Sequence, residues 1–204
     1  MQTTAVAWAM GAALAIAPAA AAQTGPARGA TPVTMRVWVY DYAGVAPVTL
    51  IEAEKVAAQI YRAAGIETLW AADPLERTND PLAGRTRALT VMLLPRKQTE
   101  QPCLNRLADS AMGTAFSNSD DHAVVAYVFY DRVERTAWKA HAFVAVLLGE
   151  VMAHEVGHML LPHGHSATGI MRAAWSLRMV HPGSLEEFTK DQGTLMRRRL
   201  VDRP

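Results

Sequence analysis

The sequence predicts an α+β fold in which helices pack against one mixed sheet. Two patterns support this prediction: apolar residues alternate with a period of two in several short segments, and they recur at helical spacing in longer ones. In chain order these segments are strand, helix, four strands, helix, loop and helix, an order typical of one sheet covered by helices. The 204 residues are 50% hydrophobic and 19% charged, which is typical of a globular protein with one domain.

The first half of the chain contains one predicted helix between strands. The helix is expected over 49–64, because Pro47 precedes it and Gly65 follows it, and these residue types favour the two ends of helices. Alternating apolar residues predict three strands around this helix, over 33–42, 66–70 and 88–94.

The second half contains two predicted strands and the longest predicted helix. A short edge strand is expected over 112–116, and a buried strand over 123–130, where β-branched and aromatic residues are frequent. The apolar segment 138–160 predicts a long helix that Pro162 and Gly164 end.

A closing helix and four aromatic core residues complete the predicted fold. The helix is expected over 185–200, with Ser184 as N-cap and Glu187 as its capping-box partner. Four tryptophans are predicted to be core aromatics: Trp38, Trp70, Trp138 and Trp175.

The N-terminal segment differs in composition from the rest of the chain. Residues 1–22 carry no charge, are rich in alanine and end in small residues, a pattern typical of a secretory signal peptide. Residues 23–31 are rich in Gly, Pro and Ala and predict a flexible leader, so the folded domain is expected to span 32–204. We therefore expect a secreted or periplasmic protein. Cys103, the single cysteine, is expected to be a buried thiol without a disulfide partner.

The balance of charge argues against two classes of partner. The chain has 20 Lys and Arg against 19 Asp and Glu, a net charge of +1. This balance gives no electrostatic basis for binding nucleic acid or an anionic membrane surface. We expect a monomer with neither partner once the signal peptide is removed.

The chemistry of the chain is indicated by a short stretch near the end of the long predicted helix. His154 and His158 are four residues apart, so on a helix they lie on one face and can bind one metal ion. Glu155 lies one step around the helix, beside that ion. Zinc lowers the pKa of a bound water toward roughly 7, and a carboxylate can take the water proton as general base. The stretch therefore predicts a zinc hydrolase.

A catalytic zinc needs a third protein ligand and one open position. His163 and His165 both follow the predicted end of the helix, from where a side chain can return to the metal. The residues alone leave both histidines as candidates.

The segment HEVGHMLLPHGHSATGIM, from His154 to Met171, resembles the metzincin clan of zinc endopeptidases, and within it the matrixin-like proteins. The family pattern is HExxHxxGxxH followed by a turn that carries a methionine. His154, Glu155 and His158 match it directly. The resemblance implies that His165 is the third zinc ligand and that Met171 lies beneath the metal as a structural residue.

The segment departs from the family pattern at two places. In the family pattern the third histidine falls at the position that is Gly164 here, so His165 comes one residue later than the pattern requires. The family's turn glycine falls at Leu161, which precedes Pro162 and therefore favours an extended backbone. Gly164 can supply the unusual backbone angle instead. His163 stays the alternative third ligand.

The resemblance also implies a fold and an activity. The fold is a single metzincin-like domain with a mostly parallel sheet, an antiparallel edge strand, an active-site helix, a methionine turn and a C-terminal helix. The activity is hydrolysis of peptide bonds in a peptide or protein substrate by a zinc-bound water, with Zn²⁺ as cofactor and Glu155 as general base. In this family the substrate lies along the edge strand, which corresponds to 112–116 here.

Two other functions fit parts of the sequence. One is a thermolysin-like zinc peptidase in which Glu186 or Glu187 is the third ligand. The other is a non-catalytic periplasmic zinc-binding protein. Glu155 argues against the second, because a protein that only binds zinc needs no base.

Overall fold

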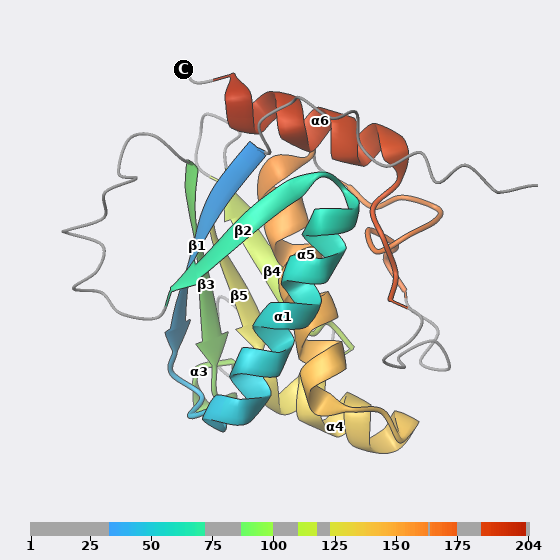
Figure 1. The fold of residues 1–204 in the computed structure, drawn as a ribbon. Coiled ribbons are helices and arrows are strands. Elements are labelled where there is room, and N and C mark those ends of the chain that lie inside the picture. Colours follow the sequence, from blue (N-terminus) through green and yellow to red (C-terminus); the bar gives the residue numbers. More distant parts are fainter. Residues whose placement is uncertain are drawn as a thin grey trace, which may run out of the picture. The chain divides into compact units, whose positions relative to one another are not determined.

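The computed structural model describes residues 33–71, 87–99, 110–117, 123–162, 164–174 and 185–202. Over these residues a five-stranded sheet is accompanied by helices (Figure 1). The strands are β1 (Val33–Asp41), β2 (Ile66–Ala71), β3 (Arg87–Leu94), β4 (Gly113–Ser117) and β5 (Ala123–Phe129). The helices are α1 (Pro47–Ala63), α3 (Arg96–Thr99), α4 (Tyr130–Ala140), α5 (Val144–Leu160) and α6 (Lys190–Val201).

The sheet is mixed, as the sequence predicts. Its strand order is β2-β1-β3-β5-β4, and β2, β1, β3 and β5 are parallel to one another. Helix α1 makes the crossover from β1 to β2, which parallel neighbours require. Strand β4 pairs antiparallel with β5 at the edge of the sheet, so the predicted edge strand is confirmed one residue later than expected.

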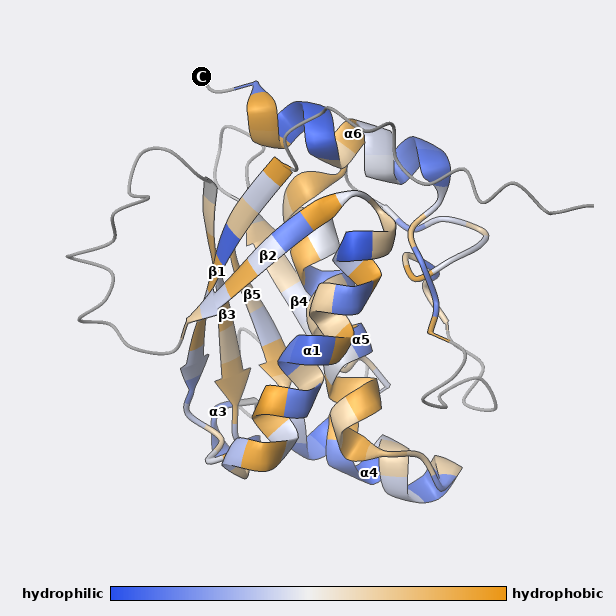
Figure 2. Cartoon of the chain, in the orientation of Figure 1, coloured by the Kyte–Doolittle hydropathy of each residue, from blue (hydrophilic) through white to orange (hydrophobic). Residues whose placement is uncertain are grey.

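Helices α1 and α5 lie side by side against one face of the sheet (Figure 1). The hydroxyl of Tyr61 on α1 donates a hydrogen bond of 2.9 Å to the backbone carbonyl of Ala153 on α5. Almost every residue of α5 from Val146 onward is buried, and Figure 2 shows this helix as mostly apolar. A helix that is apolar on all sides belongs in a core. The core thus fixes the helix that carries the candidate metal ligands.

The predicted long helix over 138–160 is wrong, because two helices occupy this part of the chain. Helix α4 ends at Ala140, and α5 begins at Val144. Between them His141 has a left-handed backbone with φ of 52°, and its amide donates back to the last turn of α4. A glycine is the residue usually found in that conformation. Since the residue here is a histidine, the break could not be predicted from the sequence.

The closing helix begins later than predicted. Helix α6 starts at Lys190, with Thr189 as N-cap and Gln192 as its capping-box partner. Glu187 is not part of this helix, and its carbonyl instead accepts a hydrogen bond of 3.0 Å from the amide of Ile170. Residues 185–189 are held in a non-helical conformation by this bond and by buried Phe188, whose ring lies 5.0 Å from that of Tyr61. Ser184 lies outside the described residues.

The four tryptophans differ in environment. Trp38 is buried as predicted, and Trp70 is half-buried against the core. Trp138 is 80% exposed on α4, so its prediction as a core residue is wrong. Trp175, Cys103, the predicted signal peptide (1–22) and the predicted leader (23–31) lie outside the described residues.

None of the described helices has both the length and the apolar character that crossing a bilayer requires.

Candidate metal centre and cleft

Helix α5 carries the first two candidate ligands in its last two turns. His154 is buried, and its Nδ1 donates a hydrogen bond of 2.7 Å to the backbone carbonyl of Ile170. Because Nδ1 holds the proton, Nε2 presents a lone pair to a metal, an arrangement common for histidine ligands. Burial lowers the pKa of His154 to about 4, so the ring is neutral near pH 7. His158 lies one turn further along the same face.

Three histidines from two segments come together at one point. His154, His158 and His165 each offer one ring nitrogen, and these nitrogens all lie within 4.8 Å of one another. The Nε2 atoms of His154 and His158 are 3.0 Å apart. Two nitrogens that share a tetrahedral zinc at about 2.0–2.1 Å lie about 3.3–3.4 Å apart, so this pair is close to ligand geometry. The donor set fits Zn²⁺ with three neutral imidazoles.

The loop after α5 places His165 beside the helix. Leu161 is extended, with φ of −113° and ψ of 159°, as its position before proline predicts. Gly164 has φ of 111°, a backbone conformation that favours glycine, and it supplies the sharp turn expected of it. His163, the alternative third ligand, lies outside the described residues.

Backbone hydrogen bonds close this loop just beyond His165. The amide of Ser166 donates to the carbonyl of Met171 over 2.8 Å, and its hydroxyl donates to the carbonyl of Thr168 over 2.7 Å. Ile170 uses both of its backbone groups: its amide donates to Glu187, and its carbonyl accepts from His154. The loop therefore positions His165 and also orients the ring of His154.

Met171 is buried below the histidine-bearing turn of α5. A Cβ atom built on Gly157 would lie only 2.6 Å from Sδ of Met171 and 3.0 Å from the ring of Phe188. The glycine in the HEVGH stretch thus allows close packing of this methionine. Its role beneath a metal ion stays a prediction.

Glu155 is a buried carboxylate next to the three histidines. It is 5% exposed, and its Oε2 has no hydrogen-bond partner among the described residues. Burial raises the pKa of Glu155 to about 8. A cation held by the histidines would oppose this shift by favouring the charged form. A buried acceptor without a partner is costly, so Oε2 is suited to a ligand or a water in the cleft.

Strand β4 begins directly over Glu155. A Cβ atom built on Gly113 would lie 2.6 Å from both Cγ and Oε1 of Glu155. No side chain other than hydrogen fits there unless the carboxylate moves. The edge strand and the predicted general base are therefore immediate neighbours.

The carboxylates of the thermolysin-like alternative lie elsewhere. Glu186 makes an ion pair of 2.5 Å with Arg172, and its backbone amide approaches Oε1 of the buried Glu150 at 3.4 Å. Glu187 is exposed. Among the described residues, the group of side chains able to hold a metal consists of the three histidines, without Glu186 or Glu187.

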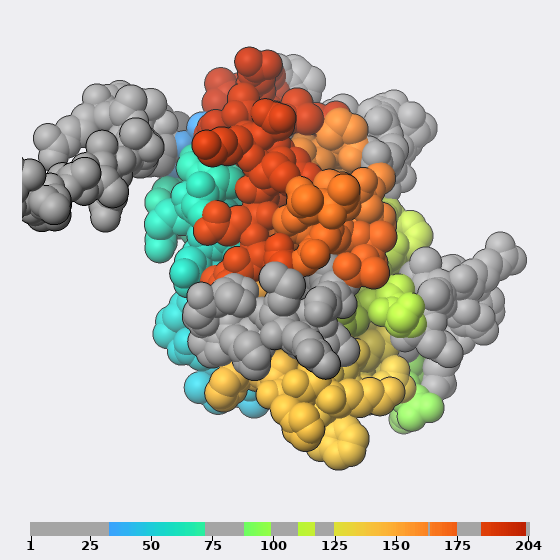
Figure 3. Space-filling view, turned by 90° about the vertical axis from the view of Figure 1, so that its right-hand side faces the viewer, coloured from blue at the N-terminus to red at the C-terminus, as the bar shows by residue number. Residues whose placement is uncertain are grey.

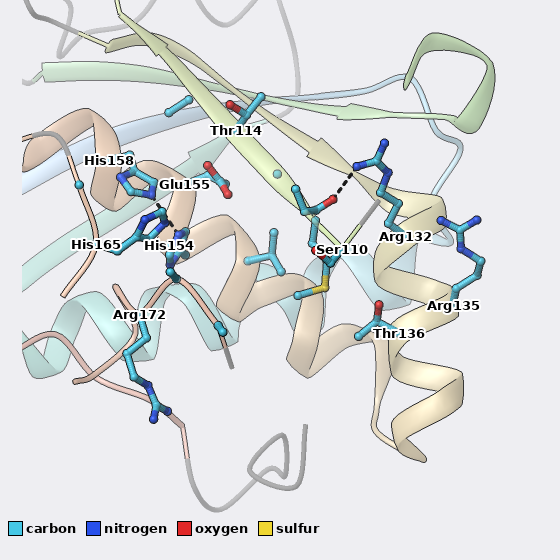
Figure 4. A pocket seen from close by; sticks show the side chains of 18 of the residues that line it. Ser110, Thr114, Arg132, Arg135, Thr136, His154, Glu155, His158, His165 and Arg172 are labelled. Atoms are coloured by element: carbon cyan, nitrogen blue, oxygen red, sulfur yellow. Dashed lines mark hydrogen bonds between the residues drawn. The ribbon is translucent and has the colours of Figure 1, made fainter. Parts of the chain in front are cut away.

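The histidines and Glu155 line an open cleft with a volume of about 1160 Å³. Figure 4 shows the histidines and Glu155 at one end of this cleft and α4 at the other. On the face seen in Figure 3, the loop after α5 and the segment before α6 lie side by side. The reactive groups are thus accessible to a molecule larger than a single amino acid.

Sequence reasoning missed three parts of this site. The carbonyl of Ile170, which orients His154, gives no sequence signal because it is a backbone group. Gly113 gives a weak signal, as a glycine within the edge strand predicted over 112–116. Four residues of α4 that line the cleft recur at helical spacing, a pattern that could have been found: Arg132, Arg135, Thr136 and Lys139.

The solved structures that resemble this chain include the following two. The archaemetzincin from Methanopyrus kandleri has a TM-score of 0.48 and 18% sequence identity, covering 83% of this chain and 97% of its own. The zinc-dependent peptidase from Methanocorpusculum labreanum has a TM-score of 0.49 and 13% identity, covering 78% of this chain and 99% of its own. No protein-family model and no curated protein matches the sequence. At these values the functional conclusion rests on the side chains of the cleft.

Proposed function

We propose that this protein is a secreted zinc-dependent endopeptidase. The observation that carries the proposal is the placement of Glu155, a buried carboxylate with an unpartnered oxygen, beside three converging histidines in an open cleft. A site with three imidazole ligands leaves a fourth position on zinc for the reaction.

His154, His158 and His165 would hold the ion. When bound, zinc supplies a Lewis acid that polarises a carbonyl group and acidifies water. The neutral state of His154 and its hydrogen bond to Ile170 prepare this ring for coordination without a change of protonation.

Glu155 serves as the general base. Its Oε2 accepts a proton from the attacking water and later returns this proton to the leaving amine, which restores the carboxylate. Burial keeps bulk water away and raises the proton affinity of the group, while the cation keeps it ionised before the reaction. The contact with Gly113 holds the carboxylate in place.

The outer edge of β4, the last strand of the described sheet, is proposed to bind the substrate as an added strand. Residues 113–115 line the cleft, and β4 is bonded on its other side to β5. Main-chain hydrogen bonds to an edge strand hold an extended peptide independently of its sequence. A peptide bound along β4 on both sides of the metal centre would be cleaved internally, and this supports an endopeptidase.

Three finer features belong to the same proposal. The family is proposed to be the matrixin-like branch of the metzincins, because the HEVGH stretch, His165 and Met171 resemble its pattern. Met171 is proposed to support the metal centre from below, since it packs under Gly157. Secretion is proposed from the composition of residues 1–22.

Peptide hydrolysis by the zinc-loaded protein and by Glu155→Gln tests the proposal. We expect the wild-type protein to cleave peptides and to lose this activity on chelation. Glu155→Gln should keep its zinc and lose about 10²–10⁴ in kcat, the usual contribution of a general base. Glu52→Gln, which neutralises an exposed carboxylate on α1, is the matched control and should stay active. If zinc-loaded wild type cleaves no member of a broad peptide library, the protein is a zinc-binding protein without this activity.

A further inference from the structure

The cleft is lined by an excess of cations. Among the described residues that line it, Glu155 is the one acidic side chain. The whole chain has nearly equal numbers of acidic and basic residues, so this excess is local. The basic side chains that line the cleft are Arg96, Arg132, Arg135, Lys139 and Arg172.

Most of these cations gather at the end of the cleft opposite the histidines. Positions 132, 135, 136 and 139 are spaced by three or four residues, so they lie on one face of α4. Figure 4 shows Arg132 and Arg135 projecting from α4 at this end. We call the group Arg96, Arg132, Arg135 and Lys139 the basic arm.

Arg135 and Lys139 are the members of the basic arm that are suited to bind a ligand. Arg132 instead has a structural role, because it is 8% exposed, donates a hydrogen bond of 2.9 Å to the carbonyl of Ala111 and lies over the ring of Phe129. Arg135 is 53% exposed, and its ion pair with Asp131 is long, at 3.5 Å. Lys139 is exposed on the next turn. Arg135 and Lys139 can therefore turn toward an anion at small cost.

The position of the arm along β4 indicates which part of a substrate it meets. Strand β4 begins at Gly113 over Glu155, and Arg132 binds the carbonyl of Ala111, which precedes that strand. The arm therefore lies beside the segment that leads into β4. An added strand pairs more stably in the antiparallel direction, and its C-terminal part then lies along this segment.

We propose that Arg135 and Lys139 bind a substrate carboxylate on the C-terminal side of the cleaved bond. The carboxylate is that of an acidic side chain or of the peptide's own C-terminus, which share the same chemistry. This inference rests on the proposed peptidase function. It makes the basic arm the specificity-determining part of the cleft.

Cleavage-site profiling tests the inference. A random peptide mixture is digested by the zinc-loaded protein, and the cleaved bonds are identified by mass spectrometry. We expect Asp, Glu or the chain end to be enriched after the cleaved bond. Arg135→Gln with Lys139→Gln should reduce this preference about tenfold, the effect of losing two exposed ion pairs. Lys55→Gln with Arg62→Gln, which removes two exposed cations from α1, is the matched control.

The source of the carboxylate is separated by amidating the peptides at their C-termini. If the cleavage preference persists in the amidated peptides, the carboxylate belongs to an acidic side chain. If the preference disappears, the carboxylate is the C-terminus of the peptide. High salt should weaken either preference, because exposed ion pairs are screened. Equal cleavage of acidic and neutral sites, or an unchanged preference in the Arg135 and Lys139 double variant, overturns the inference.

A binding measurement decides the inference independently of catalysis. Two dye-labelled peptides that differ by one Glu→Gln exchange are titrated with the zinc-loaded Glu155→Gln protein, which is expected not to cleave them, and are followed by fluorescence anisotropy. We expect about tenfold tighter binding of the acidic peptide and loss of this difference in the double variant. Equal binding overturns the inference even if peptides are cleaved. Absence of cleavage with selective binding instead contradicts the peptidase function alone.

Discussion

The end of α5 and the loop that follows it both contribute to the candidate metal centre, but they are held in different ways. His154 and His158 lie on a helix that the core surrounds, so apolar packing fixes their positions. His165 lies on an exposed loop whose shape depends on a few backbone hydrogen bonds. The helix therefore provides a rigid half of the site, and the loop provides a half that single changes can displace.

The comparison predicts its largest effect at the third ligand. His165→Ala should weaken zinc binding on the order of 10²–10³-fold. A protein zinc site has only a few ligands, so each ligand contributes a large share of the binding free energy. A competition titration against a zinc-binding dye measures the change. His163→Ala is the matched control and should bind zinc as the wild type does. Loss of zinc in His163→Ala with retention in His165→Ala would reverse the assignment of the loop ligand.

The second prediction concerns the buried acid of the helix half. Burial raises the pKa of Glu150 from 4.5 to about 7, so its neutral form is favoured in the folded protein. The stability that Glu150 contributes in its neutral form is fully present below about pH 4.5 and is lost as the pH rises through 7. In metal-free protein this loss amounts to about 3 kcal/mol of unfolding free energy.

Denaturant unfolding of wild type and Glu150→Gln at pH 4.5 and pH 8 isolates this effect. The shifted pKa of His154 acts in the opposite direction, with stability lost as the pH falls below 6.5, but it is common to both proteins. When the pH is raised from 4.5 to 8, we expect the unfolding free energy of Glu150→Gln to increase relative to that of the wild type. A constant difference between the proteins at both pH values would show that Glu150 does not titrate in this range.

The third prediction tests the backbone of the loop half. Gly169 has φ of 72°, and a Cβ atom there would lie 2.5 Å from the carbonyl oxygen of Glu187. Gly169→Ala should destabilise the protein by about 1–3 kcal/mol and weaken zinc binding, because the Ile170 amide loses its partner. Gly44→Ala is the control. Its backbone has a similar φ of 71°, but the added methyl group meets open space, so it introduces backbone strain without a steric clash. Equal zinc affinity in the two variants would show that this contact does not support the site.

The smallest expected effect lies where the edge strand meets the helix half. Gly113→Ala places a methyl group against the Glu155 side chain, whose flexible end can move away. The fold and the zinc content should be retained, while kcat falls about tenfold because the base is displaced from its reacting position. Steady-state kinetics with zinc analysis on the same sample measures both. An unchanged kcat would mean that Gly113 has no part in holding the base.

The difference between the two halves also explains what the sequence could predict. The strands, α1 and the candidate ligand pair His154 and His158 follow from periodicity, because core packing enforces that periodicity in the structure. Pro162 and Gly164 marked the turn after α5 correctly. These are the features that local side-chain chemistry determines.

The features that could not be predicted depend on contacts distant in sequence or on backbone groups. The break at His141 has no glycine to mark it, and the late start of α6 depends on the hydrogen bond between Ile170 and Glu187. The contact between Gly113 and Glu155 depends on strand β4, which lies about forty residues earlier in the chain. Three of the four residues of the basic arm lie on α4, a helix that the sequence did not predict.

The central claim is that His154, His158 and His165 together hold one zinc ion beside Glu155. A crystal structure of the zinc-loaded protein, with anomalous data at the zinc edge, tests it most directly. We expect one zinc with three histidine nitrogens at about 2.0–2.1 Å and a fourth position without a protein ligand. A zinc bound by Glu186 or Glu187, or one located away from the three histidines, would contradict it.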